Sequence, residues 1–169
     1  MKENAVMVTI RKVNINTDCE KIFEMIRSRE EDLLPNQMKC FNVNEFYHWL
    51  LQQFSGLYHE MYVFAKKDAM KEIVGFVLTY DYRVYDGHCF LCTCFSEDIV
   101  QSGLENFIDL MFREYPLKKI FWELTVTSEH ELSMASELGF TKELLLKEYK
   151  YQKGKYVDVC VLSVYSGNL

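Results

Sequence analysis

The sequence has little proline and glycine, with 2 Pro and 7 Gly in 169 residues. Such low contents exclude a collagen-like chain and a Gly/Pro-rich linker protein. Basic residues are the minority among the charges, with 19 Lys and Arg against 25 Asp and Glu, and the formal net charge is −6. This balance disfavours nucleic acid as a partner and suits a cationic small molecule slightly better. No run of about 18 apolar residues is present, so the sequence predicts no membrane-spanning helix.

Apolar residues make up 49% of the chain and aromatic residues 15%, which is typical of a globular protein. A chain of this length buries roughly 70% of its unfolded surface, which predicts a single domain over residues 1–169 that needs no disulfides. The N-terminal segment MKENAVMVTIRKVNI has no continuous apolar run and no small-residue cleavage site. We therefore expect no signal peptide, a cytoplasmic location and free thiols.

Four residues that can bind a metal ion gather in one short segment, at His88, Cys89, Cys92 and Cys94. If this segment is a strand, Cys92 and Cys94 face one side and Cys89 faces the other. A tetrahedral zinc site needs ligands that converge, and the chain has no second C-x-x-C or H-x-x-H pair. We expect these cysteines to be small core residues, and we expect no metal site.

Hydrophobic periodicity predicts strands and helices in the order β-α-α-β-β-β-α-β-α-β-β. The third helix has the clearest pattern, an apolar stripe from Leu104 to Tyr115 that Pro116 ends. Short connections predict antiparallel neighbours in the middle of the chain, and two later β-α-β passages need crossovers. The predicted fold is therefore α/β, with a mixed, mostly antiparallel sheet and helices on both faces.

The predicted strands span residues 6–11, 61–65, 73–80, 88–95, 119–126, 144–151 and 156–165. The polar residues 66–72 are expected to join the second and third strands.

Helix ends are predicted from capping patterns. Thr17 with Glu20, and Ser128 with Glu131, have the spacing of capping boxes that begin the first and fourth helices. Gly139 is placed as the residue after the fourth helix, followed by an apolar residue.

This element order resembles the GNAT acetyltransferase fold, from about Val6 to Tyr165. EIVGFVLTY looks like the family's third strand, with Gly75 at its usual place, and KKIFWELTV followed by a capped helix and ASELGF resembles its strand–helix–LGF segment. LKEYKYQKGKYVDVCVLSVY resembles the C-terminal hairpin of the RimJ/RimL-like branch, with G-K-x-x-D at Gly154, Lys155 and Asp158. The resemblance implies acetyl transfer from acetyl-CoA to an amine.

In this fold, the strands that match residues 88–95 and 119–126 splay apart, and the pantetheine arm lies in the gap. The resemblance implies that backbone groups near Thr93, Cys94 and Phe95 pair with the arm as an added strand would. It also implies direct attack of the amine on the thioester, with no covalent enzyme intermediate. A backbone N–H of the same strand would hold the oxyanion.

The resemblance places the pyrophosphate at the N-terminus of the third helix, at Gln101, Ser102 and Gly103. Free N–H groups and the positive end of the helix dipole favour an anion there. The family's loop normally reads Q/R-x-x-G-x-G/A, whereas this chain keeps one glycine and has the acids Glu97 and Asp98. Two readings stay open: the loop binds the pyrophosphate, or the acids only stabilise the helix N-terminus and no phosphate binds.

The residues expected to donate a proton in the family are altered. A tyrosine that often protonates the leaving thiolate is replaced by Ala135, and the RimJ/RimL-like Asn and Ser align with Ser128 and Glu131. Ser128 is therefore a candidate cofactor contact, and the nearby hydroxyl of Ser133 is a candidate catalytic group.

Glu123 is the candidate base for the acceptor amine. It lies in an apolar strand that is expected to be covered on both faces, where a carboxylate is costly unless it has a partner or a task. The alternative is a Glu that faces an edge or forms a salt bridge.

Two functions remain open from the sequence. The first is an acetyl-CoA-dependent N-acetyltransferase that acts on a primary amine of a small molecule or of a protein N-terminus. The second is a GNAT-fold binding or regulatory module with little or no activity, which the altered loop and Ala135 favour. Tyr80, Tyr82, Arg83 and Tyr85 form either a substrate or homodimer surface or an ordinary strand and turn.

Overall fold

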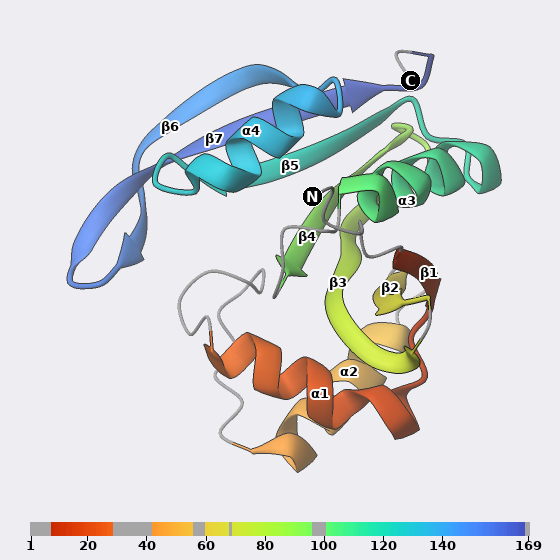
Figure 1. The fold of residues 1–169 in the computed structure, drawn as a ribbon. Helices are drawn as coiled ribbons and strands as arrows, with labels where there is room; N and C mark the ends of the chain where they lie inside the picture. The colour runs from red at the N-terminus through yellow and green to blue at the C-terminus, as the bar shows by residue number, and fades with distance from the viewer. Residues whose placement is uncertain (1–7, 29–41, 56–59, 68, 96–100, 168–169) are drawn as a thin grey trace, which may run out of the picture.

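The computed structural model describes residues 8–28, 42–55, 60–67, 69–95 and 101–167. It contains the predicted elements in the predicted order (Figure 1). The strands are β1 (Val8–Lys12), β2 (Met61–Lys66), β3 (Ala69–Arg83), β4 (His88–Phe95), β5 (Lys119–Thr125), β6 (Thr141–Gln152) and β7 (Lys155–Tyr165). The helices are α1 (Ile15–Ser28), α2 (Val43–Ser55), α3 (Gln101–Glu114) and α4 (Glu129–Glu137).

The seven strands form one sheet in the order β1-β2-β3-β4-β5-β7-β6. The pair β4–β5 is parallel, and every other neighbouring pair is antiparallel. The parallel pair requires a crossover, which α3 supplies. The α/β fold class and the mixed, mostly antiparallel sheet are thus confirmed.

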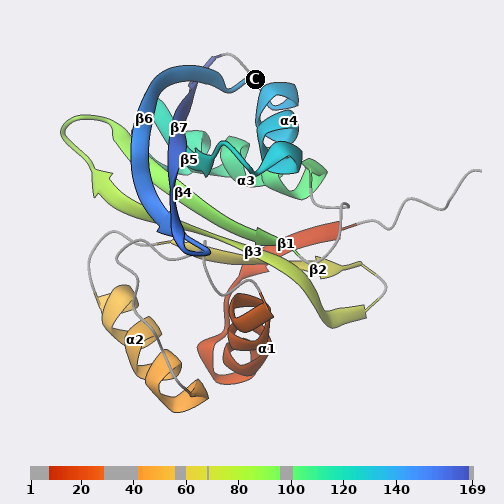
Figure 2. The same ribbon diagram turned by 90° about the vertical axis from the view of Figure 1, so that its left-hand side faces the viewer.

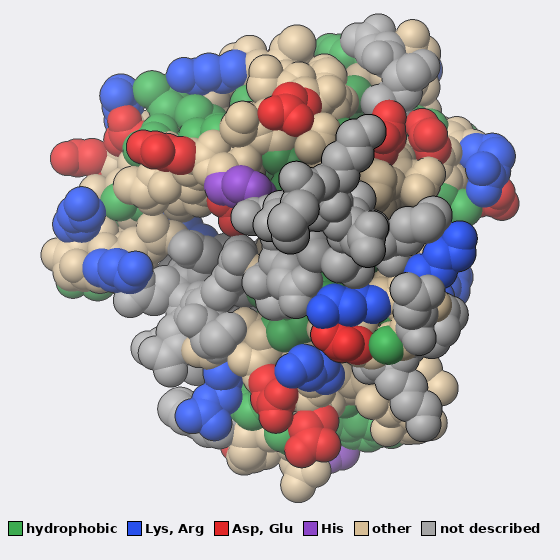
Figure 3. All heavy atoms as spheres, viewed as in Figure 1, with side chains coloured by type: hydrophobic (Ala, Val, Ile, Leu, Met, Phe, Trp, Pro, Cys, Tyr) green, Lys and Arg blue, Asp and Glu red, His purple; other side chains and the backbone are tan. Residues whose placement is uncertain are grey.

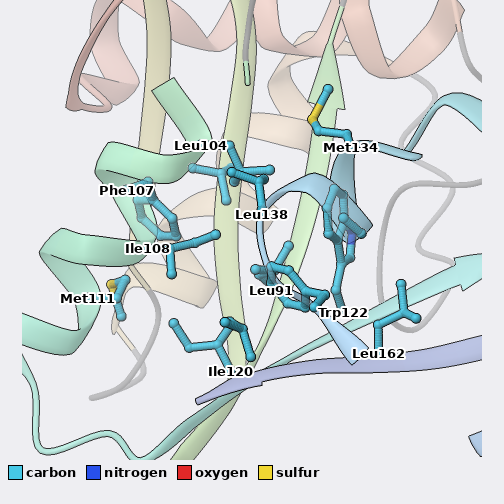
Figure 4. Close-up of a cluster of buried hydrophobic side chains, with 14 of the residues drawn as sticks. Leu91, Leu104, Phe107, Ile108, Met111, Ile120, Trp122, Met134, Leu138 and Leu162 are labelled. Atoms are coloured by element: carbon cyan, nitrogen blue, oxygen red, sulfur yellow. The ribbon is translucent and has the colours of Figure 1, made fainter. Parts of the chain in front are cut away.

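The helices cover opposite faces of the sheet, α1 and α2 on one and α3 and α4 on the other (Figure 2). Each face has its own cluster of buried side chains because successive residues of a strand point to opposite sides. The cluster under α3 and α4 is the larger, and Figure 4 shows its centre. Its members include Leu91, Leu104, Phe107, Ile108, Met111, Ile120, Trp122, Met134, Leu138 and Leu162. The cluster under α1 and α2 includes Ile22, Phe46, Val63, Phe76 and Cys94.

Two glycines make room for the ring of Phe64 on β2. A Cβ on Gly103 would lie 2.8 Å from Cδ1 of Phe64, and a Cβ on Gly75 would lie 3.1 Å from Cδ2 of the same ring. Gly75 is also close to its β4 partner, since its Cβ would lie 2.9 Å from Cδ1 of Phe95. The two glycines therefore let the start of α3 and the middle of β3 approach one aromatic side chain.

Both predicted capping boxes are wrong. Helix α1 begins two residues before Thr17, and Asn14 caps it, because the Asn14 side chain accepts a hydrogen bond from the N–H of Asn16 at 3.1 Å. Ser128 does occupy the N-cap of α4, but its side chain caps no N–H group. Its hydroxyl instead lies 2.9 Å from that of Thr125.

The predicted end of α4 is confirmed. Gly139 has a φ of 77°, and its N–H donates to Ser136 at 3.1 Å. The N–H of Phe140 donates to the carbonyl of Ala135 at 2.9 Å, which completes a Schellman motif. The predicted turn between β6 and β7 is also present, with a positive φ at both Lys153 and Gly154.

The connection between β2 and β3 is shorter than predicted. Residues 66–72 were expected to be a polar joining segment, but β3 begins at Ala69, which pairs with Lys66. The side chains of Lys66 and Glu72 form an ion pair across this hairpin, so polar residues extend the ladder. No helix in the described part of the chain is long and apolar enough to cross a membrane.

Candidate active site

The strands β4 and β5 pair only over their first halves. The pairs run from His88 with Lys119 to Leu91 with Trp122. Beyond that point β4 continues to pair with β3 as far as Phe95, while β5 continues to pair with β7. The described parts of β4 and β5 therefore diverge after Leu91 and Trp122, as the resemblance predicted. Figure 3 shows an opening in the molecular surface below α4.

Glu123 is the first residue of β5 beyond the last β4–β5 pair. Its side chain is half-buried, and its Oε2 atom accepts a hydrogen bond from the hydroxyl of Tyr80 at 3.0 Å. Tyr80 comes from β3, so this bond spans the strand that lies between β3 and β5. Among the described residues, the hydrogen-bond partner of Glu123 is therefore a neutral phenol and not a cation.

Electrostatics keep the Tyr80 hydroxyl protonated. Burial, followed by the carboxylate of Glu123, raises the pKa of Tyr80 far above its ordinary value. The hydroxyl is therefore a donor at every physiological pH and fixes one oxygen of Glu123. Among the described residues no hydrogen bond to the other carboxylate oxygen is present, so that oxygen can accept from a second partner.

Cys92 begins the diverging part of β4, as Glu123 begins that of β5. Burial raises the pKa of Cys92 to about 12, and Cys94 and Glu123 act in the same direction while Lys150 acts against them. Cys92 is therefore a neutral thiol at pH 7, and the charges of Glu123 and Lys150 both reach it.

The C-terminal hairpin contains a bulge in β6. The pairing register changes between Leu146 and Lys150, because four residues along β6 are matched by only two along β7. Asp158 of β7 holds the bulge, since its Oδ1 accepts from the N–H of Glu148 at 2.9 Å and its Oδ2 from Lys147 at 2.7 Å. Tyr149, within the bulge, acts electrostatically on Tyr80 of β3. Bulges commonly redirect side chains beside active sites.

The three residues predicted to pair with pantetheine lie where β4 has left β5. Thr93, Cys94 and Phe95 pair with Val77, Phe76 and Gly75 of β3. Their side chains are buried. The backbone edge of β4 that faced β5 earlier in the strand is therefore the part of these residues that an added strand would contact.

The three residues predicted to hold the pyrophosphate form the first turn of α3. Gln101 is half-buried, Ser102 is exposed and Gly103 is buried against Phe64. The first turn of α3 carries no acidic residue, so its own side chains leave the positive end of the helix dipole unneutralised. The predicted acids at positions 97 and 98 lie outside the described residues.

Three residues at or near α4 were considered for the cofactor site and the proton donor: Ser128, Ser133 and Ala135. Within the described residues, none of them forms a hydrogen bond with Glu123. Ala135 is fully buried in the core cluster under α3 and α4. Ser133 is exposed, and Ser128 is half-buried with its hydroxyl bonded to Thr125. A tyrosine at position 135 would compete with core packing.

The tyrosine group that the sequence singled out is split by the structure. Tyr80 reaches Glu123, whereas Tyr82 packs against Tyr115 with ring centroids 5.7 Å apart, and Tyr85 is fully exposed. Sequence reasoning did not pair Tyr80 with Glu123. The feature that could have indicated the pair is a tyrosine in an apolar strand, because its hydroxyl needs a hydrogen-bond partner once it is buried.

The predicted division of the cysteines between the two faces of β4 is confirmed. Cys89 lies in the cluster under α3 and α4, whereas Cys94 lies in the cluster under α1 and α2, so the two cannot share a metal ion. No group of three metal-ligating residues occurs within the described ranges.

No family model and no curated protein matches the sequence. Solved structures do match the fold. A point mutant of spermidine N-acetyltransferase SpeG from Vibrio cholerae has a TM-score of 0.85 at 16% identity, covering 95% of this chain and 97% of that one. A second point mutant of SpeG has a TM-score of 0.85 at 17% identity, covering 96% of each chain.

A dodecameric structure of spermidine N-acetyltransferase from Vibrio cholerae in an intermediate state has a TM-score of 0.81 at 16% identity, covering 94% of this chain and 93% of that one. These neighbours give no support to the more specific RimJ/RimL-like assignment. They are GNAT-fold structures, and they match nearly the whole chain. The chain therefore has the GNAT fold.

Proposed function

We propose that the protein is an acetyl-CoA-dependent N-acetyltransferase that acts on a primary amine. The observation that carries the proposal is the Glu123 carboxylate, held by Tyr80 at the point where β4 and β5 separate. The GNAT fold and its acetyltransferase neighbours support the reaction class. The acceptor is a primary amine of a small molecule or of a protein N-terminus, and spermidine, named for the neighbours, is one compound to test.

In the proposed reaction, Glu123 takes a proton from the ammonium form of the acceptor, directly or through one water. The amine then attacks the thioester carbonyl, so that a C–N bond forms and the C–S bond breaks. A backbone N–H of β4 near Phe95 stabilises the oxyanion. The role of Tyr80 is positional, because its hydroxyl fixes the carboxylate and does not contact the reacting atoms.

The leaving thiolate needs a proton to become CoA. Ala135 has no group to supply one. The exposed hydroxyl of Ser133 is the candidate that would relay a proton from water, and proximity of the two substrates would supply much of the remaining rate enhancement.

Acetyl-CoA would lie along the part of β4 that has left β5, at Thr93, Cys94 and Phe95. Its pyrophosphate would lie at the first turn of α3, where N–H groups and the helix dipole favour an anion. Ser128 would contact it from the start of α4. This arrangement supplies the acetyl group as a co-substrate and requires no metal.

Two measurements test the proposal. Acetyl-CoA at 100 times its dissociation constant would add about 2.7 kcal/mol to the free energy of unfolding, which a thermal shift would detect. Release of CoA thiol that depends on an added amine, and that Glu123→Gln lowers, would support catalysis. Binding without amine-dependent release would instead identify the binding module that buried Ala135 favours.

A homodimer is a further part of the proposal, and the dodecameric neighbour is the finding that makes it worth testing. Light scattering across a concentration series would detect it. A mass equal to one chain at every concentration would overturn it.

A further inference from the structure

The side-chain amide of Gln152, at the end of β6, is buried without a partner. Gln152 is 7% exposed, and within the described part of the chain its Nε2 atom has no hydrogen-bond partner. A buried amide donor is normally satisfied by protein or by ordered water. An unsatisfied one is a cost that a ligand with an oxygen acceptor would remove.

The sheet register places Gln152 on the same face as Glu123. Glu123 pairs with Val161 of β7, and Lys150 of β6 pairs with Val157, which is four residues from Val161 on the same strand. Paired residues share a face, and residues an even number apart along a strand share it too. Lys150 therefore faces the side of Glu123, and Gln152, two residues further, faces it as well.

Two residues of the hairpin affect the pKa values of groups in the site. Lys150 interacts electrostatically with Cys92, and Tyr149 does so with Tyr80. Figure 2 shows the β6–β7 hairpin bending toward the face of the sheet that α1 and α2 cover. The acceptor side of the proposed active site thus has a carboxylate at Glu123 and, further along β6, an ammonium and an unsatisfied amide donor.

We propose that Gln152 and Lys150 bind a carboxylate or an amide carbonyl that the acceptor carries at a distance from its reacting amine. This inference depends on the acetyltransferase function proposed above. The Nε2 group of Gln152 donates to the oxygen, and Lys150 supplies positive charge beside it. A second ammonium group on the acceptor would be repelled by Lys150, so the site favours an amine with an oxygen-bearing tail over a polyamine.

The experiment compares four sets of acceptors with acetyl-CoA: ω-amino acids of increasing chain length, the corresponding ω-amino amides, n-alkylamines of equal length, and spermidine. At the chain length that spans the two sites, kcat/KM for the amino acid and the amide is expected to exceed that for the alkylamine by about tenfold, the value of one good hydrogen bond. Spermidine is expected to be the poorer substrate.

Three variants assign the effect. Gln152→Met, which keeps the size but removes the donor, is expected to raise KM for the amino acid and the amide about tenfold, leave the alkylamine unchanged and not lower the melting temperature. Lys150→Gln is expected to raise KM for the ω-amino acid, which carries a carboxylate, but not for the ω-amino amide. Tyr151→Phe is the matched control, because Tyr151 points to the opposite face and its ring packs on Tyr156.

The outcomes separate the two proposals. If no amine is acetylated, the acetyltransferase function fails and the inference fails with it. If amines are acetylated but the oxygen-bearing tail gives no advantage, or Gln152→Met leaves that advantage intact, only the inference is overturned. If Gln152→Met does not fold, the contrast between carboxylate and amide in Lys150→Gln decides.

Discussion

The hydroxyl of Tyr80 donates a 3.0 Å hydrogen bond to Glu123 across an intervening strand. The bond joins β3 to β5 where β4 and β5 cease to pair, so it fixes a carboxylate at the entrance of the gap between them. Tyr80 also packs against Phe90 of that strand, with ring centroids 5.4 Å apart. Packing and hydrogen bonding together restrict both side chains, and such restriction is what a catalytic base requires.

Replacing Glu123 by Gln is expected to lower kcat/KM for amine acetylation by about 10²-fold or more, because the shape is kept while the proton acceptor is lost. The measurement is the initial rate of CoA release at saturating acetyl-CoA. Glu105→Gln, the same change at an exposed position on α3, is the control and should leave the rate unchanged. Equal rates in the two variants would remove Glu123 from the mechanism.

Replacing Tyr80 by Phe is expected to reduce the loss of unfolding free energy at alkaline pH. Because burial and Glu123 raise the pKa of Tyr80 in the folded state, its contribution is fully present below the unfolded value of about 10 and is lost as pH rises above it. Urea unfolding at pH 8 and at about pH 11 would show a smaller loss of free energy in Tyr80→Phe than in the original protein. An identical loss in both would contradict the account.

Replacing Asp18 by Asn is expected to reduce the loss of unfolding free energy at acid pH. Burial pushes the pKa of Asp18 up, but hydrogen bonds from Arg11 and from the N–H of Asn14 outweigh it, so the net pKa lies below 3.8. The stability that this carboxylate gives is therefore present above about pH 4 and lost as pH falls through the folded-state pKa. At pH 7 the variant should lose about 1–3 kcal/mol.

The control for this prediction is Glu24→Gln, which alters an exposed carboxylate on α1. Unfolding free energies at pH 7 and at about pH 3 are compared for the three proteins. The unfolding free energy should change less between the two pH values in Asp18→Asn than in the other two proteins. A change as large as that of the original protein would rule out the assignment.

Replacing Gly103 by Ala is expected to weaken binding of CoA. The added Cβ would lie 2.8 Å from Cδ1 of Phe64, and the start of α3 must shift to accept it. Overpacking of this kind costs about 1–3 kcal/mol of stability and would move the N–H groups proposed to bind the pyrophosphate. Calorimetric titration of CoA is the measurement, with Asn106→Ala, at an exposed position later on α3, as control. Unaltered affinity in Gly103→Ala would place the pyrophosphate elsewhere.

Periodicity predicted the element order and the two faces of the sheet because burial follows the 3.6- and 2-residue repeats. It did not locate the start of α1. Asn14 and Thr17 both have acceptors suited to an N-cap, and the Thr17 hydroxyl is drawn instead to Asp18 at 3.1 Å. Local spacing cannot decide between two caps when a third side chain, placed by the fold, takes one of them.

The sequence singled out Glu123 because a carboxylate in an otherwise apolar strand needs a partner, and the structure gives it one. That its partner is Tyr80, 43 residues earlier, depends on the register of β3 with β4 and of β4 with β5. The unsatisfied amide of Gln152 was not identifiable either. Alternation along the strand places Gln152 on a face, but it does not reveal that the side chain is buried or that its amide lacks a partner among the described residues.

The most direct measurement of the central claim is a crystal structure with bound CoA. The account predicts the pantetheine arm between β4 and β5 along Thr93 to Phe95, the pyrophosphate at the first turn of α3, and the thiol on the side of Glu123. Coenzyme A bound elsewhere, or side chains filling the space between the diverging strands in the presence of excess CoA, would contradict it.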